Sequence, residues 1–226
     1  MNFKEKELII FDFDGTLINS IPDLTLAVNK MLAHYNLQAL TTEQVTPFIG
    51  NGAKPLVRRS LEYRMPNQER SGRLLEEAFK MYLSAYKDIR CIDTYLYPGV
   101  LDTLIKLDKA GYKMAICTNK PYGFILPILE ALKITKYFKC WIGEDSLAEK
   151  KPSAAPLLYL TKELNATIEK SIMVGDSKND ILAAQNAAME SIGVSYGYNY
   201  NQDIADFKPT IVVDNFADLQ DLFLEV

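Results

Sequence analysis

Cysteine and histidine are scarce in this chain of 226 residues, which contains three cysteines and a single histidine, His34. The number of cysteines is odd, and no two of them are spaced as C-x-x-C; they are Cys91, Cys117 and Cys140. A scaffold held by disulfides and a structural zinc site are therefore both disfavoured. We expect a protein of a reducing compartment whose thiols stay free.

The chain also lacks a long apolar run and an excess of positive charge. No run reaches the roughly 18 residues that a membrane span requires, and residues 1–7 include acidic side chains where a secretion signal is basic and then apolar. Lys and Arg number 25 against 29 Asp and Glu, so the net charge is −4, whereas duplex-binding proteins usually carry a basic face. We therefore expect a cytoplasmic protein with no membrane or nucleic-acid partner.

What the chain does contain is an ordinary globular composition, with 48% hydrophobic and 24% charged residues. Short, nearly continuous apolar runs alternate with segments of helical periodicity, and the runs lie at 8–11, 113–117, 138–142, 171–174, 191–194 and 210–213. Such runs are typical of parallel strands buried on both faces. The pattern predicts an α/β fold with a doubly wound, Rossmann-like parallel sheet at its core.

One stretch interrupts this alternation. From about residue 18 to residue 90 the periodicity is helical, with no convincing strand, and Ser20-x-x-Asp23 and Thr41-x-x-Gln44 have the form of capping boxes. We predict an all-helical cap domain at 18–91, inserted after the first strand of a core formed by 1–17 and 92–226. The hinges are expected at 17–21 and 92–99.

The sharpest chemical signal is the hexapeptide Asp12-Phe13-Asp14-Gly15-Thr16-Leu17 at the end of the first predicted strand. In an open α/β sheet the ligand crevice lies outside the carboxyl ends of the strands. Two carboxylates this close repel each other unless a cation or a shared proton offsets the repulsion. An Asp-Gly turn with a solvated acid is the simpler alternative, but the position after a buried strand favours a site.

Three further motifs follow other predicted strands: Thr118-Asn119-Lys120, Lys150-Lys151-Pro152 and Gly175-Asp176-Ser177-Lys178-Asn179-Asp180. Each has an ordinary structural explanation by itself, since Thr118 or Asn119 can cap a helix, the lysines can be solvated and Ser177-x-x-Asp180 is itself a capping box. Together they place carboxylates, a hydroxyl and an ammonium group at one sheet edge. Hard oxygen ligands with open positions suit Mg²⁺.

The combination of D-x-D-G-T and G-D-S-x-N-D resembles the haloacid dehalogenase superfamily of phosphatases. Within it, the chain is most similar to the phosphoglycolate phosphatase branch, which has an α-helical cap after the first strand. That closer similarity depends on residues 48–53, Phe-Ile-Gly-Asn-Gly-Ala, and on Lys150-Lys151-Pro152. The chain departs from the branch at Ser153-Ala154, where those enzymes carry His-Pro.

The resemblance implies a role for each motif. Asp12 would be the nucleophile that forms an aspartyl-phosphate, and Asp14 the general acid and base. Thr118 and Asn119 would hold phosphoryl oxygens, and Lys151, more than its neighbour Lys150, would neutralise negative charge. The implied Mg²⁺ ligands are Asp12, Asp14 through its backbone carbonyl, and Asp176, with Asp180 orienting Lys151 or supporting the metal.

The predicted cap is expected to select the substrate. The loop of Gly50, Asn51 and Gly52 could approach the core, and the forked guanidinium of Arg58 could bind a substrate carboxylate. The alternative for Arg58 and for Lys54 is that each is a solvated helix residue with no role in binding the substrate. The histidine at position 34 is expected to be partly buried and without a chemical role.

The favoured prediction is a Mg²⁺-dependent phosphomonoester hydrolase for a small anionic phosphate ester, with 2-phosphoglycolate first. A pyrophosphatase or nucleotidase with the same cap and a β-phosphoglucomutase-like isomerase stay open. A phosphonate hydrolase would need a cap lysine, for which Lys54 is the candidate. A non-catalytic protein that binds a phosphate ligand is the remote alternative, and the chain could be a monomer or a homodimer.

Overall fold

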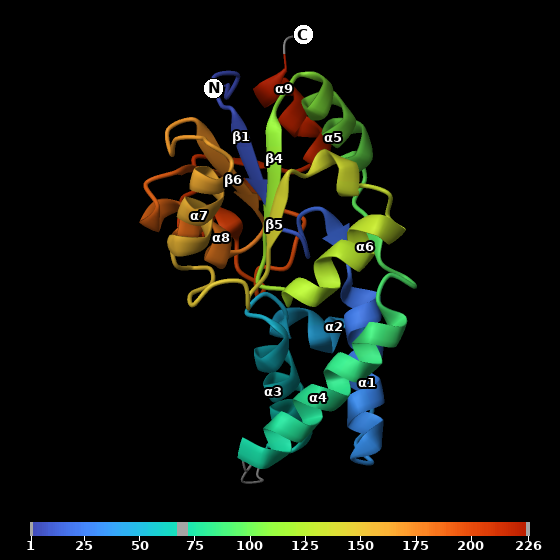
Figure 1. The fold of residues 1–226 in the computed structure, drawn as a ribbon. Coiled ribbons are helices and arrows are strands. Elements are labelled where there is room, and N and C mark those ends of the chain that lie inside the picture. Colours follow the sequence, from blue (N-terminus) through green and yellow to red (C-terminus); the bar gives the residue numbers. More distant parts are fainter. Residues whose placement is uncertain (1, 67–71, 225–226) are drawn as a thin grey trace.

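A parallel sheet forms the centre of the molecule in the computed structural model, which describes residues 2–66 and 72–224 (Figure 1). Its strand order is β5-β4-β1-β6-β7-β8, and every neighbouring pair is parallel. The strands are β1 (Leu8–Phe11), β4 (Lys113–Cys117), β5 (Cys140–Ile142), β6 (Ser171–Gly175), β7 (Glu190–Val194) and β8 (Ile211–Val213). All six predicted strands are confirmed, although β5 begins two residues later than the apolar run.

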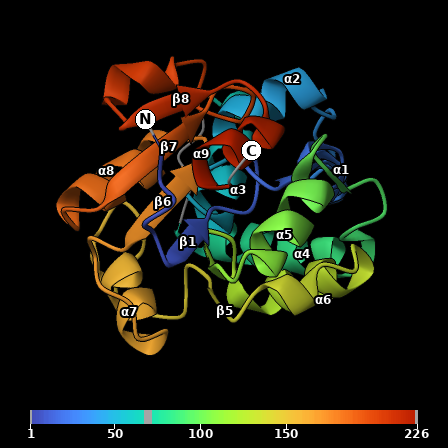
Figure 2. The same ribbon diagram turned by 90° about the horizontal axis from the view of Figure 1, so that it is seen from above.

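Helices cover both faces of this sheet (Figure 2). The helices α5 (Val100–Lys109), α6 (Ile125–Ala131) and α9 (Leu219–Phe223) pack on one face, and α7 (Ala155–Glu163) and α8 (Lys178–Asn186) pack on the other. Alternate β1 side chains enter the two apolar layers, with Ile9 and Phe11 in one and Leu8 and Ile10 in the other. The doubly wound α/β prediction is confirmed, because helices cover both faces of the sheet and the central strands β1 and β6 are buried throughout.

A separate group of helices lies beyond the carboxyl ends of the strands (Figure 1). It contains α1 (Ile21–His34), α2 (Thr42–Val45), α3 (Ala53–Arg64) and α4 (Gly72–Ile89), with a short 3₁₀ turn at Thr46–Phe48 between α2 and α3. Other 3₁₀ turns lie in the rest of the chain, at Tyr122–Phe124, Thr135–Tyr137, Ile204–Phe207 and Phe216–Asp218. These helices share their own apolar cluster, which includes Val28, Leu32, Val57 and Tyr82. The division of the chain into a core and a cap at residues 18 and 91 stays a prediction that this separate cluster supports.

A two-stranded antiparallel ribbon joins the helical group to the sheet. Its strands are β2 (Ile18–Asn19) and β3 (Tyr95–Leu96), so the expectation of no strand from residue 18 onward is wrong at its first two residues. Strands of two residues are too short to carry a recognisable periodicity. Both chain connections to the helices therefore run side by side.

The Ser20-x-x-Asp23 motif does not form the predicted capping box. The Ser20 side chain makes no cap hydrogen bond, whereas the buried Asp23 carboxylate accepts hydrogen bonds from the backbone N–H groups of residues 92, 93 and 94 at 2.9–3.1 Å. Asp23 thus ties the second connection to the start of α1. The Thr41-x-x-Gln44 box is confirmed.

None of the helices within residues 2–66 and 72–224 combines the length and apolarity that crossing a membrane requires.

Candidate active site

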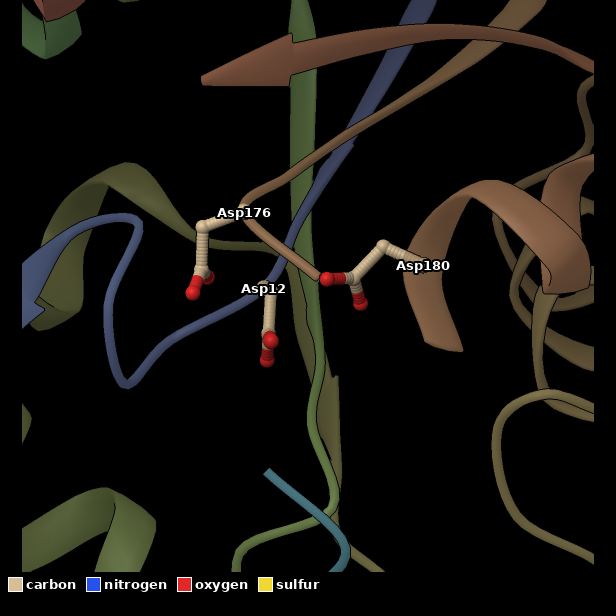
Figure 3. Close-up of side chains that lie close together, drawn as sticks. All are labelled: Asp12, Asp176 and Asp180. Carbon is tan, nitrogen blue, oxygen red and sulfur yellow. The ribbon is translucent and has the colours of Figure 1, made fainter. Parts of the chain in front are cut away.

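Three carboxylates meet at the carboxyl edge of the sheet (Figure 3). Asp12 follows β1, Asp176 follows β6, and Asp180 lies in the first turn of α8. All three are buried, and one oxygen from each lies within 4.8 Å of the others. The sheet topology explains the meeting, because parallel neighbours β1 and β6 end at the same edge. We call these residues the acidic cluster.

Asp12 is placed between a backbone amide and a lysine. Its Oδ1 accepts a hydrogen bond from the Phe13 N–H at 2.7 Å and lies 3.0 Å from Lys151 Nζ. Burial raises the pKa of Asp12 to about 7, with a further upward contribution from Asp180 and a downward one from Lys151. This carboxylate is therefore costly to ionise without additional positive charge.

Asp176 is enclosed by two chain segments. It accepts hydrogen bonds from Thr16 Oγ1 and from the Tyr198 backbone N–H, each at 2.7 Å. Burial, followed by the charges of Asp12 and Asp180, raises the pKa of Asp176 well above its usual value. A Cβ atom on Gly15 or on Gly197 would lie 2.4 or 2.1 Å from Asp176 atoms, so only glycine leaves room for this carboxylate.

The paired lysines at 150 and 151 have different roles. Lys151 is 2% exposed, and its Nζ lies 2.5 Å from Asp180 Oδ1 and 3.0 Å from Asp12 Oδ1. Burial lowers the pKa of Lys151, but the charges of Asp12 and Asp180 outweigh burial and leave that pKa above its usual value. Lys151 therefore keeps its charge beside the acidic cluster.

Lys150 contacts the loop that precedes α3 instead. Its Nζ donates to the Asn51 carbonyl at 2.9 Å and to Glu144 Oε2 at 2.6 Å. The Gly50 carbonyl accepts hydrogen bonds from the side chains of Asn119 and Asn179, both at 3.1 Å. The predicted approach of this loop to the core edge is present, and side chains of the core hold it.

Asp180 contacts both the start of α8 and Lys151. Its Oδ2 accepts hydrogen bonds from the Ser177 N–H at 2.9 Å and from the Ser177 hydroxyl at 2.8 Å, while Oδ1 faces Lys151. The same carboxylate thus fixes the start of α8 and orients the lysine.

The Asp14 side chain is not part of the acidic cluster and has other partners. It accepts a hydrogen bond from Ser20 Oγ at 2.5 Å, and its two oxygens lie 3.0 and 3.1 Å from Lys120 Nζ. Neither partner was predicted from the sequence, although Lys120 follows Thr118 and Asn119 directly in one of the motifs. The predicted metal contact of Asp14 through its backbone carbonyl stays a prediction.

A pocket lies between the sheet edge and the helical group. The core contributes Asp12, Asp14, Thr118, Asn119 and Lys120 to its walls, and the helical side contributes mostly apolar groups together with Gly50, Gly52, Tyr82 and Tyr86. Thr118 and Asn119 are buried, and Thr118 Oγ1 accepts a hydrogen bond from the Lys120 N–H at 3.2 Å. The walls thus come from both parts of the chain, as a lid over the core would require.

Other cap predictions lie outside this pocket. Arg58 is exposed and lies 4.0 Å from Glu62, and Lys54 pairs with Glu76 on the surface. The Asn51 side chain accepts a hydrogen bond from Arg59 and lines a different groove. The expectation of a partly buried histidine at 34 is wrong, because the side chain is exposed at the end of α1, where its ring lies edge-on to the Tyr35 ring.

The donor set of the acidic cluster fits a divalent cation. Three carboxylates within 4.8 Å of one another carry more negative charge than Lys151 offsets. Hard carboxylate oxygens are the ligands that such cations prefer. The arrangement therefore combines a candidate cation site, a buried lysine and a pocket at one sheet edge.

Comparison with known proteins identifies the family. Residues 9–194 match the family model described as haloacid dehalogenase-like hydrolase. The chain belongs to this family. The predicted superfamily is thus confirmed, and the chain is an enzyme, a phosphatase of this hydrolase family.

The relatives of this haloacid dehalogenase-like hydrolase match it over nearly its whole length. A phosphoglycolate phosphatase of Colwellia psychrerythraea is 44% identical over 220 residues, which cover 97% of each chain. Phosphoglycolate phosphatase 1 of Pseudomonas aeruginosa is 42% identical over 94% of this chain and 78% of its own. The crystal structure of a predicted phosphoglycolate phosphatase from Haemophilus somnus matches with a TM-score of 0.92 and 38% identity over 96% of this chain and 97% of that one.

Proposed function

We propose that this phosphatase hydrolyses 2-phosphoglycolate with Mg²⁺ as its cofactor and Asp12 as its nucleophile. The observation that carries the proposal is the position of Asp12 in the acidic cluster, beside Lys151 and on the wall of a pocket closed by the helical group. The substrate follows from the curated relatives, several of which are named phosphoglycolate phosphatases at 40–44% identity.

In the first half of the reaction an Asp12 oxygen attacks the phosphorus atom, and the bond from phosphorus to the glycolate oxygen breaks. Asp14 gives a proton to the departing oxygen, and Lys151 offsets the negative charge that develops on the phosphoryl group. The products of this half are glycolate and phospho-Asp12.

In the second half, Asp14 takes a proton from a water molecule, which attacks phospho-Asp12 at phosphorus. The oxygen–phosphorus bond to Asp12 breaks, and inorganic phosphate is released with the nucleophile regenerated. Thr118 and Asn119 lie where they can hold phosphoryl oxygens, because both line the pocket beside Asp12. The helices beyond the sheet edge exclude bulk water during both halves.

Asp12 and Asp176 would hold the Mg²⁺, together with the Asp14 carbonyl, while Asp180 orients Lys151. The cation supplies positive charge that offsets the repulsion between the carboxylates and the phosphoryl group.

Phosphate release from a panel of small phosphate esters tests the proposed substrate. We expect 2-phosphoglycolate to have the highest kcat/KM, and we expect EDTA to abolish phosphate release and Mg²⁺ to restore it, because the acidic cluster needs a counter-charge. A panel of pyrophosphate, nucleoside monophosphates and β-glucose 1-phosphate provides the controls. A higher kcat/KM for any of these, or full activity in EDTA, would contradict the proposal.

Mg²⁺ binding is expected to weaken as the pH falls through about 7. Burial raises the pKa of Asp12 to about 7, so protons compete with the cation for this oxygen below that pH. A carboxyl group with a raised pKa binds its proton more tightly in the folded chain than in the unfolded one, so this group makes the metal-free protein less stable as the pH rises from 3.8 to about 7. Mg²⁺ stabilises the folded state by binding it.

Thermal unfolding with and without Mg²⁺, at about pH 5.5 and about pH 8, measures this competition. The rise in Tm on adding Mg²⁺ should be larger at the higher pH. An equal or larger rise at the lower pH would show that the cation does not bind at Asp12.

A further inference from the structure

Lys120 is the one cation among the described residues that line the pocket. Its side chain is 2% exposed, and its Nζ lies 3.0 and 3.1 Å from the Asp14 oxygens and 2.7 Å from the Tyr86 hydroxyl. The ammonium group therefore sits next to the carboxylate that would protonate the leaving oxygen. The mechanism above gives Lys120 no role.

Two tyrosines of α4 extend from this lysine along the pocket wall. Tyr82 and Tyr86 are four residues apart on one helix face, and their rings stack with centroids 5.9 Å apart. Tyr82 is 1% exposed, and its hydroxyl forms no hydrogen bond with any residue in the described part of the chain. The Tyr86 hydroxyl accepts from Lys120, so its own hydrogen is free to be donated.

Both tyrosines line the pocket, so a group bound there can accept hydrogen bonds from their hydroxyls. The walls around them are apolar and include Leu24, Leu56 and Phe124. An anion enters such surroundings only with charge-assisted hydrogen bonds. One ammonium group and two hydroxyl groups provide that set of donors.

Three cations of the helical group are engaged outside the pocket. Lys54 and Arg58 pair with glutamates on the surface, and Arg59 donates to the Phe48 carbonyl and to Asn51. The sequence-based candidate for a substrate carboxylate, Arg58, therefore faces solvent, while Lys120 faces the pocket.

We propose that Lys120, Tyr82 and Tyr86 form a leaving-group subsite that binds the carboxylate of a short phosphate ester. The inference rests on the proposed function and deepens it, because it names the residues that distinguish a carboxylated alcohol from a neutral one. Because Lys120 contacts Asp14, the subsite favours short substrates. Their carboxylate must lie within a few bonds of the ester oxygen that Asp14 protonates.

The test compares kcat/KM for 2-phosphoglycolate with kcat/KM for 2-hydroxyethyl phosphate, an ester of similar length whose alcohol portion carries no charge. The ratio of the two should fall about 10- to 100-fold in Lys120→Met, which removes a cationic donor to the carboxylate, and about 5-fold in Tyr82→Phe, which removes an uncharged donor to it. Lys54→Met, which removes an exposed cation of α3, should leave the ratio unchanged. Loss of Lys120 also removes the ammonium group that pairs with Asp14. If Lys120→Met does not fold, the Tyr82→Phe variant tests the subsite by itself.

Equal losses on the two esters, or an unchanged ratio in both variants, would overturn the subsite. A wild-type enzyme that hydrolyses neither ester would contradict the proposed substrate instead. In that case, inhibition of 4-nitrophenyl phosphate hydrolysis by glycolate tests the subsite alone. Inhibition that weakens in Tyr82→Phe supports the subsite, and a wild-type enzyme that glycolate does not inhibit refutes it.

Discussion

Replacing Asp12 by asparagine is expected to lower kcat by about 10⁴-fold or more, because an amide cannot form the phosphorylated intermediate. The fold should survive. The amide oxygen can still accept the hydrogen bond from the Phe13 N–H and face Lys151 Nζ, and one negative charge leaves a cluster in which burial already disfavours ionisation.

Steady-state phosphate release on 2-phosphoglycolate and 4-nitrophenyl phosphate measures the loss, and circular dichroism with thermal unfolding checks the fold. Asp88→Asn, which changes an exposed carboxylate of α4 in the same way, is the matched control. Mass spectrometry of acid-quenched wild-type enzyme should locate the phosphoryl group on Asp12. Hydrolysis near the wild-type rate by Asp12→Asn would refute the nucleophile assignment.

Replacing Lys151 by methionine should damage both stability and catalysis. The substitution leaves Asp12 and Asp180 buried without their shared ammonium group, and removing one partner of a buried ion pair costs about 3–5 kcal/mol of unfolding free energy. Loss of a positive charge that faces the transferring phosphoryl group should also lower kcat by about 10²- to 10³-fold.

The neighbouring lysine provides the control. Lys150→Met removes contacts to the Asn51 carbonyl and Glu144, which hold a loop of the helical group, so KM should rise several-fold while kcat changes little. Denaturant unfolding and steady-state kinetics on both variants separate the two roles. Equal effects of the two substitutions on kcat would contradict the assignment of Lys151 to the reaction centre.

The linkage between the first chain connection and the acidic cluster could not be found from the sequence. Tyr198 donates its backbone N–H to Asp176, and its hydroxyl accepts a hydrogen bond from the Ser20 N–H beside β2. No motif marks Tyr198, and 178 residues separate it from Ser20. Only the closing of the chain on itself brings these groups together.

The sequence by itself determined the sheet and the set of acids at its edge. The apolar runs predict buried parallel strands, and the segments that follow parallel strands lie at a common edge, so the sequence predicts that Asp12 and Asp176 meet. The observed β1–β6 pairing and the acidic cluster agree with that expectation.

Only the tertiary structure decided which neighbouring side chains serve the site. Lys151 enters the acidic cluster while Lys150 turns to the Asn51 loop, and Lys120 and Tyr82 line the pocket while Arg58 does not. The physical reason is that strand order fixes where a segment ends, whereas the direction of a lysine or tyrosine depends on packing against residues far away in the chain. In this molecule those distant residues belong to the helices that lie across the sheet edge.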